Sequence, residues 1–189
     1  MRASVPLMKN FNTAGPSVVG DHYLIDPLAR IDLAEVEALI AAKRYFVLHA
    51  PRQTGKTTAL LALMAHLNAQ GRYRALYANI EAAQAARGRV EAGIATICSV
   101  LARSAALYLH DDWMQQWLAQ AGPQVQIEDR ISSMLSGFSQ HCAQPVVLLL
   151  DEVDALVGDT LISLLRQIRA GYAQRPGAFP QSVILCGVR

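Results

Sequence analysis

One segment between an apolar strand and a helix constrains this chain more than any other feature. Ala50–Thr58 reads Ala-Pro-Arg-Gln-Thr-Gly-Lys-Thr-Thr, and it follows Tyr45–His49, a short run of aromatic and β-branched residues. An apolar stretch of helical character comes next and ends near Gly71. In the pattern GxxxxGK followed by Ser or Thr, a tight turn points backbone N–H groups at a phosphate, beside the positive end of the helix. The segment therefore predicts a phosphate-binding loop (P-loop) in an α/β fold.

The residues of this loop suit different parts of a nucleoside triphosphate. Gly55 permits close backbone approach, Lys56 reaches the β- and γ-phosphates, and the Thr57 hydroxyl is a ligand for Mg²⁺. Ala50 replaces the first glycine of the pattern, and it is small enough to enter the turn. We expect Arg52 to point toward solvent or a neighbouring domain. The predicted nucleotide-binding residues are Ala50, Pro51, Arg52, Gln53, Thr54, Gly55, Lys56, Thr57 and Thr58. A chance match is the alternative, and the flanking strand and helix argue against it.

A second apolar strand ends in two acids. Val146–Leu150 is a continuous apolar run, and Asp151 and Glu152 follow it directly. Open α/β sheets bind ligands at the carboxyl edge of their strands, which places these acids near the P-loop. We expect Asp151 to hold Mg²⁺ through water, and Glu152 to act with Lys56 in catalysis by orienting or deprotonating the attacking water. A solvated turn or helix cap is the alternative for this pair in isolation.

Four further polar residues have two interpretations each. Arg189 follows a predicted last strand, where it could sense the γ-phosphate as a catalytic group or be a plain chain end. Glu81 closes the second strand, where it could position water or be solvated. Asp154 favours a capping or structural role over metal binding. His49, at a strand end, favours a hydrogen-bonded core histidine over a catalyst.

The remaining pattern alternates strands with helices. We expect a helix from its cap Asp32 to about Lys43, a strand over Tyr73–Ile80, mainly helix over Ala82–Gln144, and a last strand over Ser182–Val188. The first two strands and the helix between them form a parallel βαβ unit. We expect a further helix, capped by Asp159, whose core-facing residues are Leu161, Leu164, Leu165 and Ile168.

Composition restricts the class of protein. Hydrophobic residues make up 52% of the 189 residues and charged residues 17%, which excludes a disordered chain and fits a helix-covered parallel sheet. A net charge of +2 is too small to indicate a nucleic-acid-binding surface. Apolar runs such as Pro145–Leu150 fall short of the roughly 18 residues that span a membrane. Cys98, Cys142 and Cys186 lack metal-site spacing and indicate reduced thiols. We therefore expect a cytoplasmic protein without a membrane partner.

The two motifs and the N-terminal residues together resemble a known group. APRQTGKTT and LLLDEVD, preceded by FNTAGP at Phe11–Pro16 and HYLIDPLARID at His22–Asp32, resemble prokaryotic AAA-like P-loop ATPases related to the STAND group of signalling NTPases. A Glu directly after the Asp is typical of the additional-strand catalytic-glutamate class. In that class a further strand lies between the two motif strands, and Ser182–Val188 is the candidate for it.

The resemblance implies a fold, cofactors and further site residues. It implies a three-layer α/β P-loop NTPase with a mainly parallel sheet in strand order 5-1-4-3-2, with ATP and Mg²⁺ bound. It implies that residues around His22–Pro27, His22 and Tyr23 among them, contact the base. Residues 1–30 are then a lead-in to the nucleotide site and 31–189 the ATPase core. We expect that core to lack its last strand and lid, which would belong to a longer parent chain.

The function that follows is hydrolysis of Mg-ATP by an AAA-like or STAND-like ATPase domain. The alternative is a nucleotide-gated scaffold or signalling switch with little turnover of its own. Either would act on a protein partner or on C-terminal domains of the parent chain. A small-molecule kinase would need an acceptor pocket and an arginine-rich lid, neither of which the sequence shows clearly. A DNA-loading ATPase is possible only by analogy with the family, because these residues contain no basic recognition helix.

Overall fold

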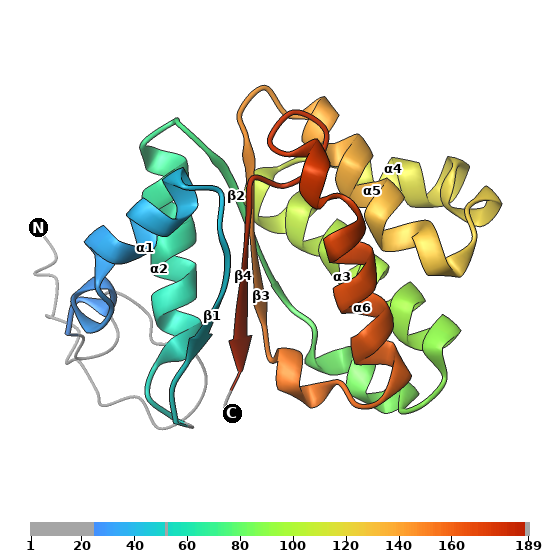
Figure 1. Ribbon diagram of the computed structural model, residues 1–189, viewed down its shortest axis with the longest axis horizontal. Helices are drawn as coiled ribbons and strands as arrows, with labels where there is room; N and C mark the ends of the chain where they lie inside the picture. Colours follow the sequence, from blue (N-terminus) through green and yellow to red (C-terminus); the bar gives the residue numbers. More distant parts are fainter. Residues whose placement is uncertain (1–24, 52, 188–189) are drawn as a thin grey trace, which may run out of the picture.

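A parallel sheet organises the protein. The computed structural model describes residues 25–51 and 53–187. Its strands are β1 (Tyr45–His49), β2 (Arg74–Asn79), β3 (Val146–Asp151) and β4 (Ser182–Gly187), in the spatial order β1-β4-β3-β2 with every neighbouring pair parallel (Figure 1). β4 is thus inserted between the two motif strands. The predicted order is confirmed for the strands that the structure describes.

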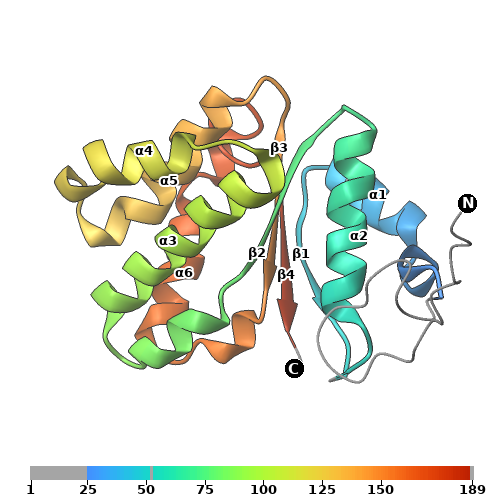
Figure 2. The ribbon, with the colours of Figure 1, turned by 180° about the vertical axis from the view of Figure 1, so that it is seen from behind.

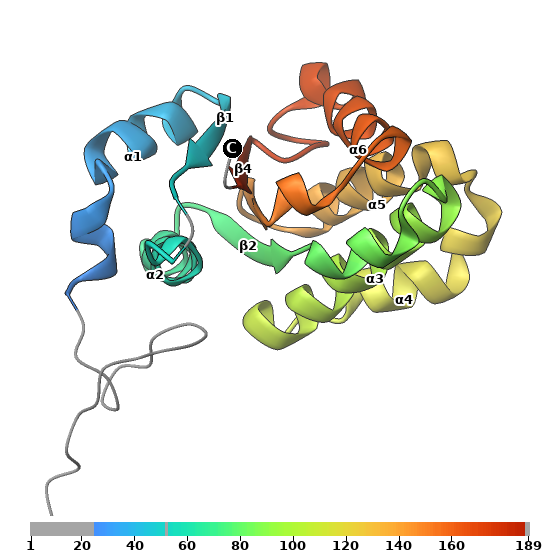
Figure 3. The same cartoon turned by 90° about the horizontal axis from the view of Figure 1, so that it is seen from below.

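Helices cover both faces of the sheet in three layers (Figures 1 and 2). One face packs against α1 (Leu33–Ala41) and α2 (Lys56–Ala69). On the other side lie α3 (Val90–Leu109), α5 (Ile127–His141) and α6 (Asp159–Ala170), with α4 (Trp113–Gln120) packed against α3 and α5. Figure 3, a view from below, shows the sheet between the two helical layers. Short 3₁₀ turns join these elements: η1 (Pro27–Arg30), η2 (Glu81–Ala86), η3 (Gly122–Gln124), η4 (Val153–Ala155) and η5 (Tyr172–Gln174).

The strand alternation divides the core into two clusters. Every residue of β3 is buried, with Val147 and Leu149 in the cluster on the α2 side. Val146, Leu148 and Leu150 belong to the cluster under α3 to α6. Both faces of a sheet inside a three-layer fold are covered, which is why β3 reads as an unbroken apolar run.

The edge strand β1 corrects one prediction. His49 is exposed rather than a core histidine, and Val47 on the same strand is 61% exposed. Among the described strands, β1 pairs with β4 alone, so its outer edge and part of one face are open. An apolar run alone does not distinguish an edge strand from a central one.

The helix starts give one confirmation and one correction. Asp32 caps α1 as predicted, since its carboxylate accepts from the Glu35 N–H at 3.0 Å. Asp159, however, is the first residue of α6, and Gly158 occupies the cap position. Leu165 is 39% exposed rather than inward. The inward face of α6 includes Gln167, whose amide oxygen accepts from the Ile131 N–H at 2.8 Å.

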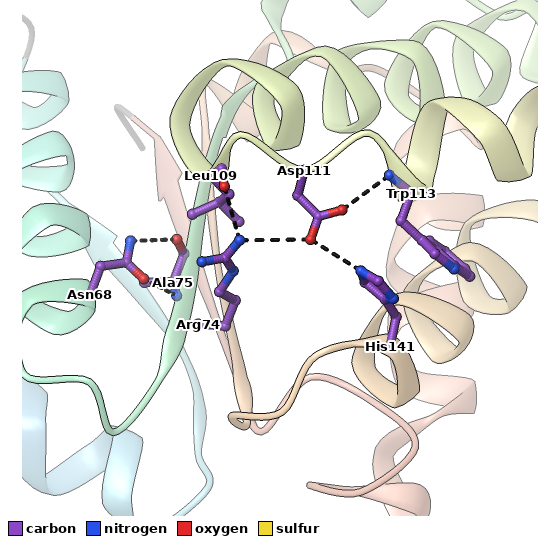
Figure 4. Close-up of polar contacts among 7 residues, drawn as sticks. All are labelled: Asn68, Arg74, Ala75, Leu109, Asp111, Trp113 and His141. Atoms are coloured by element: carbon purple, nitrogen blue, oxygen red, sulfur yellow. Dashed lines mark hydrogen bonds and ion pairs between the residues drawn. The ribbon is translucent and has the colours of Figure 1, made fainter.

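A polar network fixes the end of the sheet opposite the P-loop (Figure 4). Arg74, at the start of β2, donates to the Leu109 carbonyl at 2.9 Å and lies 3.6 Å from the Asp111 carboxylate. The same carboxylate accepts from the Trp113 N–H at 3.0 Å and lies 3.2 Å from His141 Nε2. The network thereby ties the α3–α4 turn to β2 and to the end of α5.

A second contact in Figure 4 fixes the neighbouring helix end. The Asn68 side chain, near the end of α2, donates to the Ala75 carbonyl and accepts from the Ala75 N–H, both at 2.9 Å. An amide that pairs both ways with one backbone residue acts like an additional rung of the sheet. It sets where α2 ends relative to β2.

Among the described residues, α3 is the helix that is long and apolar enough to meet the criterion for a membrane span. Half of that stretch is buried inside the fold, where α3 packs against β2 and α5. A core helix of a folded domain meets the same criterion.

Candidate nucleotide-binding site

The P-loop leaves β1 and enters α2 at Lys56. Gly55 occupies the N-cap position with φ +82°, in the left-handed region that favours glycine, and it provides no side-chain cap. The first N–H groups of α2 are therefore available to an anion at the positive end of the helix. Among the predicted loop residues, Arg52 lies outside the described residues.

The cationic side chain of the loop is already directed into it. Lys56 Nζ donates to the carbonyl oxygens of Ala50 and Pro51, each at 3.0 Å. The Thr54 hydroxyl donates to the Pro51 carbonyl at 2.8 Å and closes the turn. The ammonium group thus lies within the curve of the loop, where phosphate oxygens can replace the carbonyls as its partners.

Asp151 reaches the P-loop across the sheet edge. The Thr57 hydroxyl at the start of α2 donates to Asp151 Oδ2 at 2.7 Å, although the residues are far apart in sequence. The Asp151 carboxylate is fully buried, and its Oδ1 accepts from the Glu152 N–H at 3.0 Å. The structure therefore brings both predicted metal ligands together.

The donor set at this edge suits Mg²⁺. In the described part of the chain, no group of three His, Cys, Asp or Glu side chains is arranged to enclose a metal ion. Mg²⁺ usually keeps several waters and takes one or two protein oxygens plus substrate phosphates. One hydroxyl and one buried carboxylate beside a phosphate-binding helix end fit that requirement. Thr57 and Asp151 are the residues that could hold the ion.

Glu152 has two unusual properties. Its backbone lies in the left-handed region, with φ 59° and ψ 38°, which costs a non-glycine residue energy and is found often at functional sites. Burial, together with the charges of Asp151, Asp154 and Glu81, raises the pKa of its carboxyl, and Lys56 opposes the shift. A carboxylate of raised pKa accepts a proton more readily, as a general base must.

Two residues at the site were not predicted from the sequence. The Tyr77 hydroxyl on β2 donates to Asp151 Oδ2 at 3.1 Å. Burial, followed by the Asp151 charge, raises the pKa of this phenol above its usual value, so it remains a donor. Arg30, at the end of η1, donates from Nη1 to the Thr54 carbonyl at 2.9 Å. Strand alternation could have placed Tyr77 on a face, but no sequence pattern marked Arg30.

A cavity of about 380 Å³ lies beside the loop. It is bounded by the end of η1, by α1, by the start of α2 and by β1. Its lining includes Arg30, Ile31, Asp32, Leu48, Lys56 and Leu60. A cavity of this size, mainly apolar with a few polar groups, can hold a planar organic group.

The other predicted residues have varied positions. His22, Tyr23 and Arg189 lie outside the described residues. Glu81 is exposed at the start of η2 and contributes to the raised pKa of Glu152. The Asp154 carboxylate packs against β4, since a Cβ on Gly187 would lie 2.7 Å from its Oδ1. This contact favours the structural role that was expected for Asp154.

Solved structures resemble this fold at low sequence identity. Drosophila ORC bound to poly(dA/dT) DNA and Cdc6 aligns with a TM-score of 0.51 and 14% identity, over 86% of this chain and 24% of that one. Drosophila ORC bound to DNA aligns with a TM-score of 0.45 and 16% identity, over 82% of this chain and 36% of that one. A DNA replication initiation factor aligns with a TM-score of 0.43 and 16% identity, over 88% of this chain and 40% of that one. The chain therefore spans less than half the length of these proteins.

Sequence comparison gives the family. No curated protein matches the chain. A family model described as an AAA domain matches residues 40–189, a region that includes the P-loop, Asp151 and Glu152. This match covers most of the chain, and the inserted strand β4 agrees with the fold of P-loop ATPases. The chain therefore belongs to the AAA domain family.

Proposed function

We propose that this chain binds Mg-ATP and hydrolyses it to ADP and phosphate. The observation that carries the proposal is the 2.7 Å hydrogen bond between Thr57 and Asp151 at the uncapped start of α2. It joins the phosphate-binding end of a helix to a buried carboxylate, and Glu152 follows that carboxylate in sequence. Phosphoryl transfer needs mainly positioning and charge stabilisation, which this arrangement provides.

Each side chain then has a distinct task. The helix N–H groups and Lys56 hold the β- and γ-phosphates, and Thr57 and Asp151 hold Mg²⁺, which supplies neutralising charge as the γ-phosphate leaves. Glu152 takes the proton of the attacking water, which its raised pKa favours. Arg189 is proposed to sense the γ-phosphate.

The adenosine part is proposed to enter the cavity beside η1. Ile31, Leu48 and Leu60 supply apolar contacts for a base, and Lys56 marks the end nearest the phosphates. The lead-in residues His22 and Tyr23 are proposed to complete this pocket. Arg30 connects the lead-in to the P-loop through the Thr54 carbonyl.

Two variants test the proposal. Fluorescent ATP titrated with Mg²⁺ should bind the wild-type chain, and Lys56→Ala should abolish that binding. Glu152→Gln should retain binding and lower turnover by about 10²- to 10⁴-fold, as loss of a general base does. Glu128→Gln, the same substitution on the exposed surface of α5, is the control. Wild-type turnover in Glu152→Gln would show that the assigned base is wrong.

A second function is a nucleotide-gated switch related to the STAND group. In this proposal, groups needed for turnover belong to other segments or partners, since the chain spans only 24% of the ORC chain that it aligns with at a TM-score of 0.51. Such a switch binds Mg-ATP as above but hydrolyses it slowly alone, and a protein partner or C-terminal domains of the parent chain report the bound state. Turnover of the full-length parent with and without candidate partners distinguishes the two functions.

A further inference from the structure

The buried phenol of Tyr77 is the feature that the proposed chemistry leaves unused. Tyr77 lies in the middle of β2, with 4% of its surface exposed. β2 pairs with β3 in parallel register, with Tyr77 opposite Leu149 and Asn79 opposite Asp151. The phenol therefore extends along the sheet, toward the carboxyl edge, and its hydroxyl reaches Asp151 Oδ2 at 3.1 Å.

The surroundings of Tyr77 are otherwise apolar. Its neighbours on this face of the sheet include Ala75, Val147, Leu149 and Ile184, all fully buried. A hydroxyl among such residues is costly unless it is hydrogen-bonded, whereas phenylalanine would fill nearly the same volume. The ring is held edge-on by Tyr108 of α3, with 5.9 Å between ring centroids. The phenol is therefore fixed in direction by packing, and its hydroxyl meets the Asp151 carboxylate, with the Thr57 side chain beside it.

Asp151 receives donors on both of its oxygens. Oδ1 accepts from the Glu152 N–H at 3.0 Å, and Oδ2 accepts from the Thr57 hydroxyl at 2.7 Å as well as from Tyr77. With its proton directed to Oδ2, the Thr57 oxygen has its lone pairs free to face a cation. If the Asp151 carboxylate rotated, the Thr57 hydroxyl would no longer be held with its proton on Oδ2 and its lone pairs toward the cation. Groups that orient a metal ligand in this way typically change metal affinity by about 10- to 100-fold.

We propose that Tyr77 is a positioning residue for the Mg²⁺ site and acts through the Asp151 carboxylate. Its hydroxyl holds Oδ2 at the place where Thr57 is oriented for the ion. Because the phenol is buried behind the Asp151 carboxylate, we expect it to tune the Mg²⁺ requirement without contributing to phosphate binding. The inference rests on the proposed binding of Mg-ATP.

The test is a Mg²⁺ titration of fluorescent ATP binding in Tyr77→Phe. We expect the Mg²⁺ concentration at half-maximal binding to rise by about tenfold. Binding without Mg²⁺, in excess chelator, should stay at the wild-type level, which also shows that the variant is folded. Tyr45→Phe is the matched control, because it removes a half-buried phenol that donates to the Pro180 carbonyl at 3.3 Å, away from the site. Its Mg²⁺ midpoint should equal that of the wild type.

A double variant tests the route through the carboxylate. In an Asp151→Ala background, which has no side-chain oxygen to accept the Tyr77 hydrogen bond, Tyr77→Phe should cause no further shift in the Mg²⁺ midpoint, because the two residues act as one unit. A further tenfold shift would overturn that route. A wild-type chain whose nucleotide binding ignores Mg²⁺ would overturn the proposed function. A wild-type chain that responds to Mg²⁺, beside a Tyr77→Phe variant with the same midpoint, would overturn the role of Tyr77 alone.

Discussion

Gly55 combines two constraints that can be separated by experiment. Its φ of +82° disfavours any side chain, and a Cβ there would lie 3.1 Å from Arg30 Nη1. Gly55→Ala should lower the free energy of unfolding by about 1 to 2 kcal/mol through backbone strain. It should also weaken binding of fluorescent ATP, because the added Cβ crowds the phosphate approach and displaces Arg30. Gly71→Ala is the control, since Gly71 has φ +69° with no atom within 4 Å of its would-be Cβ. Equal ATP affinity in the two variants would contradict a role for the Arg30 contact.

The raised pKa of Glu152 gives a pH dependence of stability. Burial is its main cause, so the native state disfavours the charged form. The protonated Glu152 carboxyl therefore stabilises the native state relative to the charged form. This contribution is fully present below the unfolded-state pKa, about 4.3, and is lost as pH rises through the native-state pKa. Glu152→Gln removes the titration, so its stability relative to the wild type should increase from about pH 4 to neutral pH. Urea unfolding across that range measures the difference, with Glu128→Gln as the control for loss of a surface charge. A constant difference would contradict the shift.

Some site residues could be predicted from the sequence and others could not. Lys56, Thr57, Asp151 and Glu152 occur in motifs whose chemistry depends on local spacing, and the structure places them at one sheet edge. Tyr77 was missed because its partner is set by the register of β2 on β3, a long-range property. Arg30 was missed because the lead-in has no periodicity that would indicate a contact with the loop.

At the scale of elements, runs of apolar residues predicted each strand that the structure describes, because parallel strands covered on both faces are unbroken apolar runs. The errors fall where neighbours decide the outcome. His49 is exposed on β1, which pairs with one described strand. Leu165 is exposed because the buried face of α6 is formed by Thr160, Leu164, Gln167 and Ile168. Local pattern carries no information on either contact.

The network in Figure 4 predicts where stability can change without changing the site. Asp111→Ala would remove the acceptor of the Trp113 N–H and the carboxylate beside Arg74 and His141, in a part-buried setting where Arg74 keeps the Leu109 carbonyl. Such a loss typically costs about 1 to 3 kcal/mol. Thermal and urea unfolding should show it, while ATP affinity stays unchanged, because the network lies at the opposite end of β2 from Asp151. Asp112→Ala is the control, since Asp112 is exposed and its side chain caps nothing. Equal unfolding of both variants would contradict the structural role of the network.

At the scale of the whole molecule, the parallel arrangement gathers the site at one edge. β1 leads into the P-loop, from which α2 starts, and β3 ends at Asp151, which accepts from Thr57 of α2. The helical crossovers between parallel strands and the inserted β4 produce this arrangement from segments far apart in the chain. We expect a ligand held there to contact both the start of α2 and the end of β3. Its binding energy should therefore stabilise the fold as a unit.

This coupling predicts a thermal shift. At about 100 times its Kd, a ligand that binds only the native state adds about 2.7 kcal/mol to the free energy of unfolding. For a chain of 189 residues that raises Tm by roughly 5 to 10 °C. Mg-ATP should produce this shift in the wild type and in Glu152→Gln, whose base is not needed for binding. Lys56→Ala should show none, because its loop lacks the ammonium that we propose to hold the phosphates. An equal shift in Lys56→Ala would place the nucleotide elsewhere on the molecule.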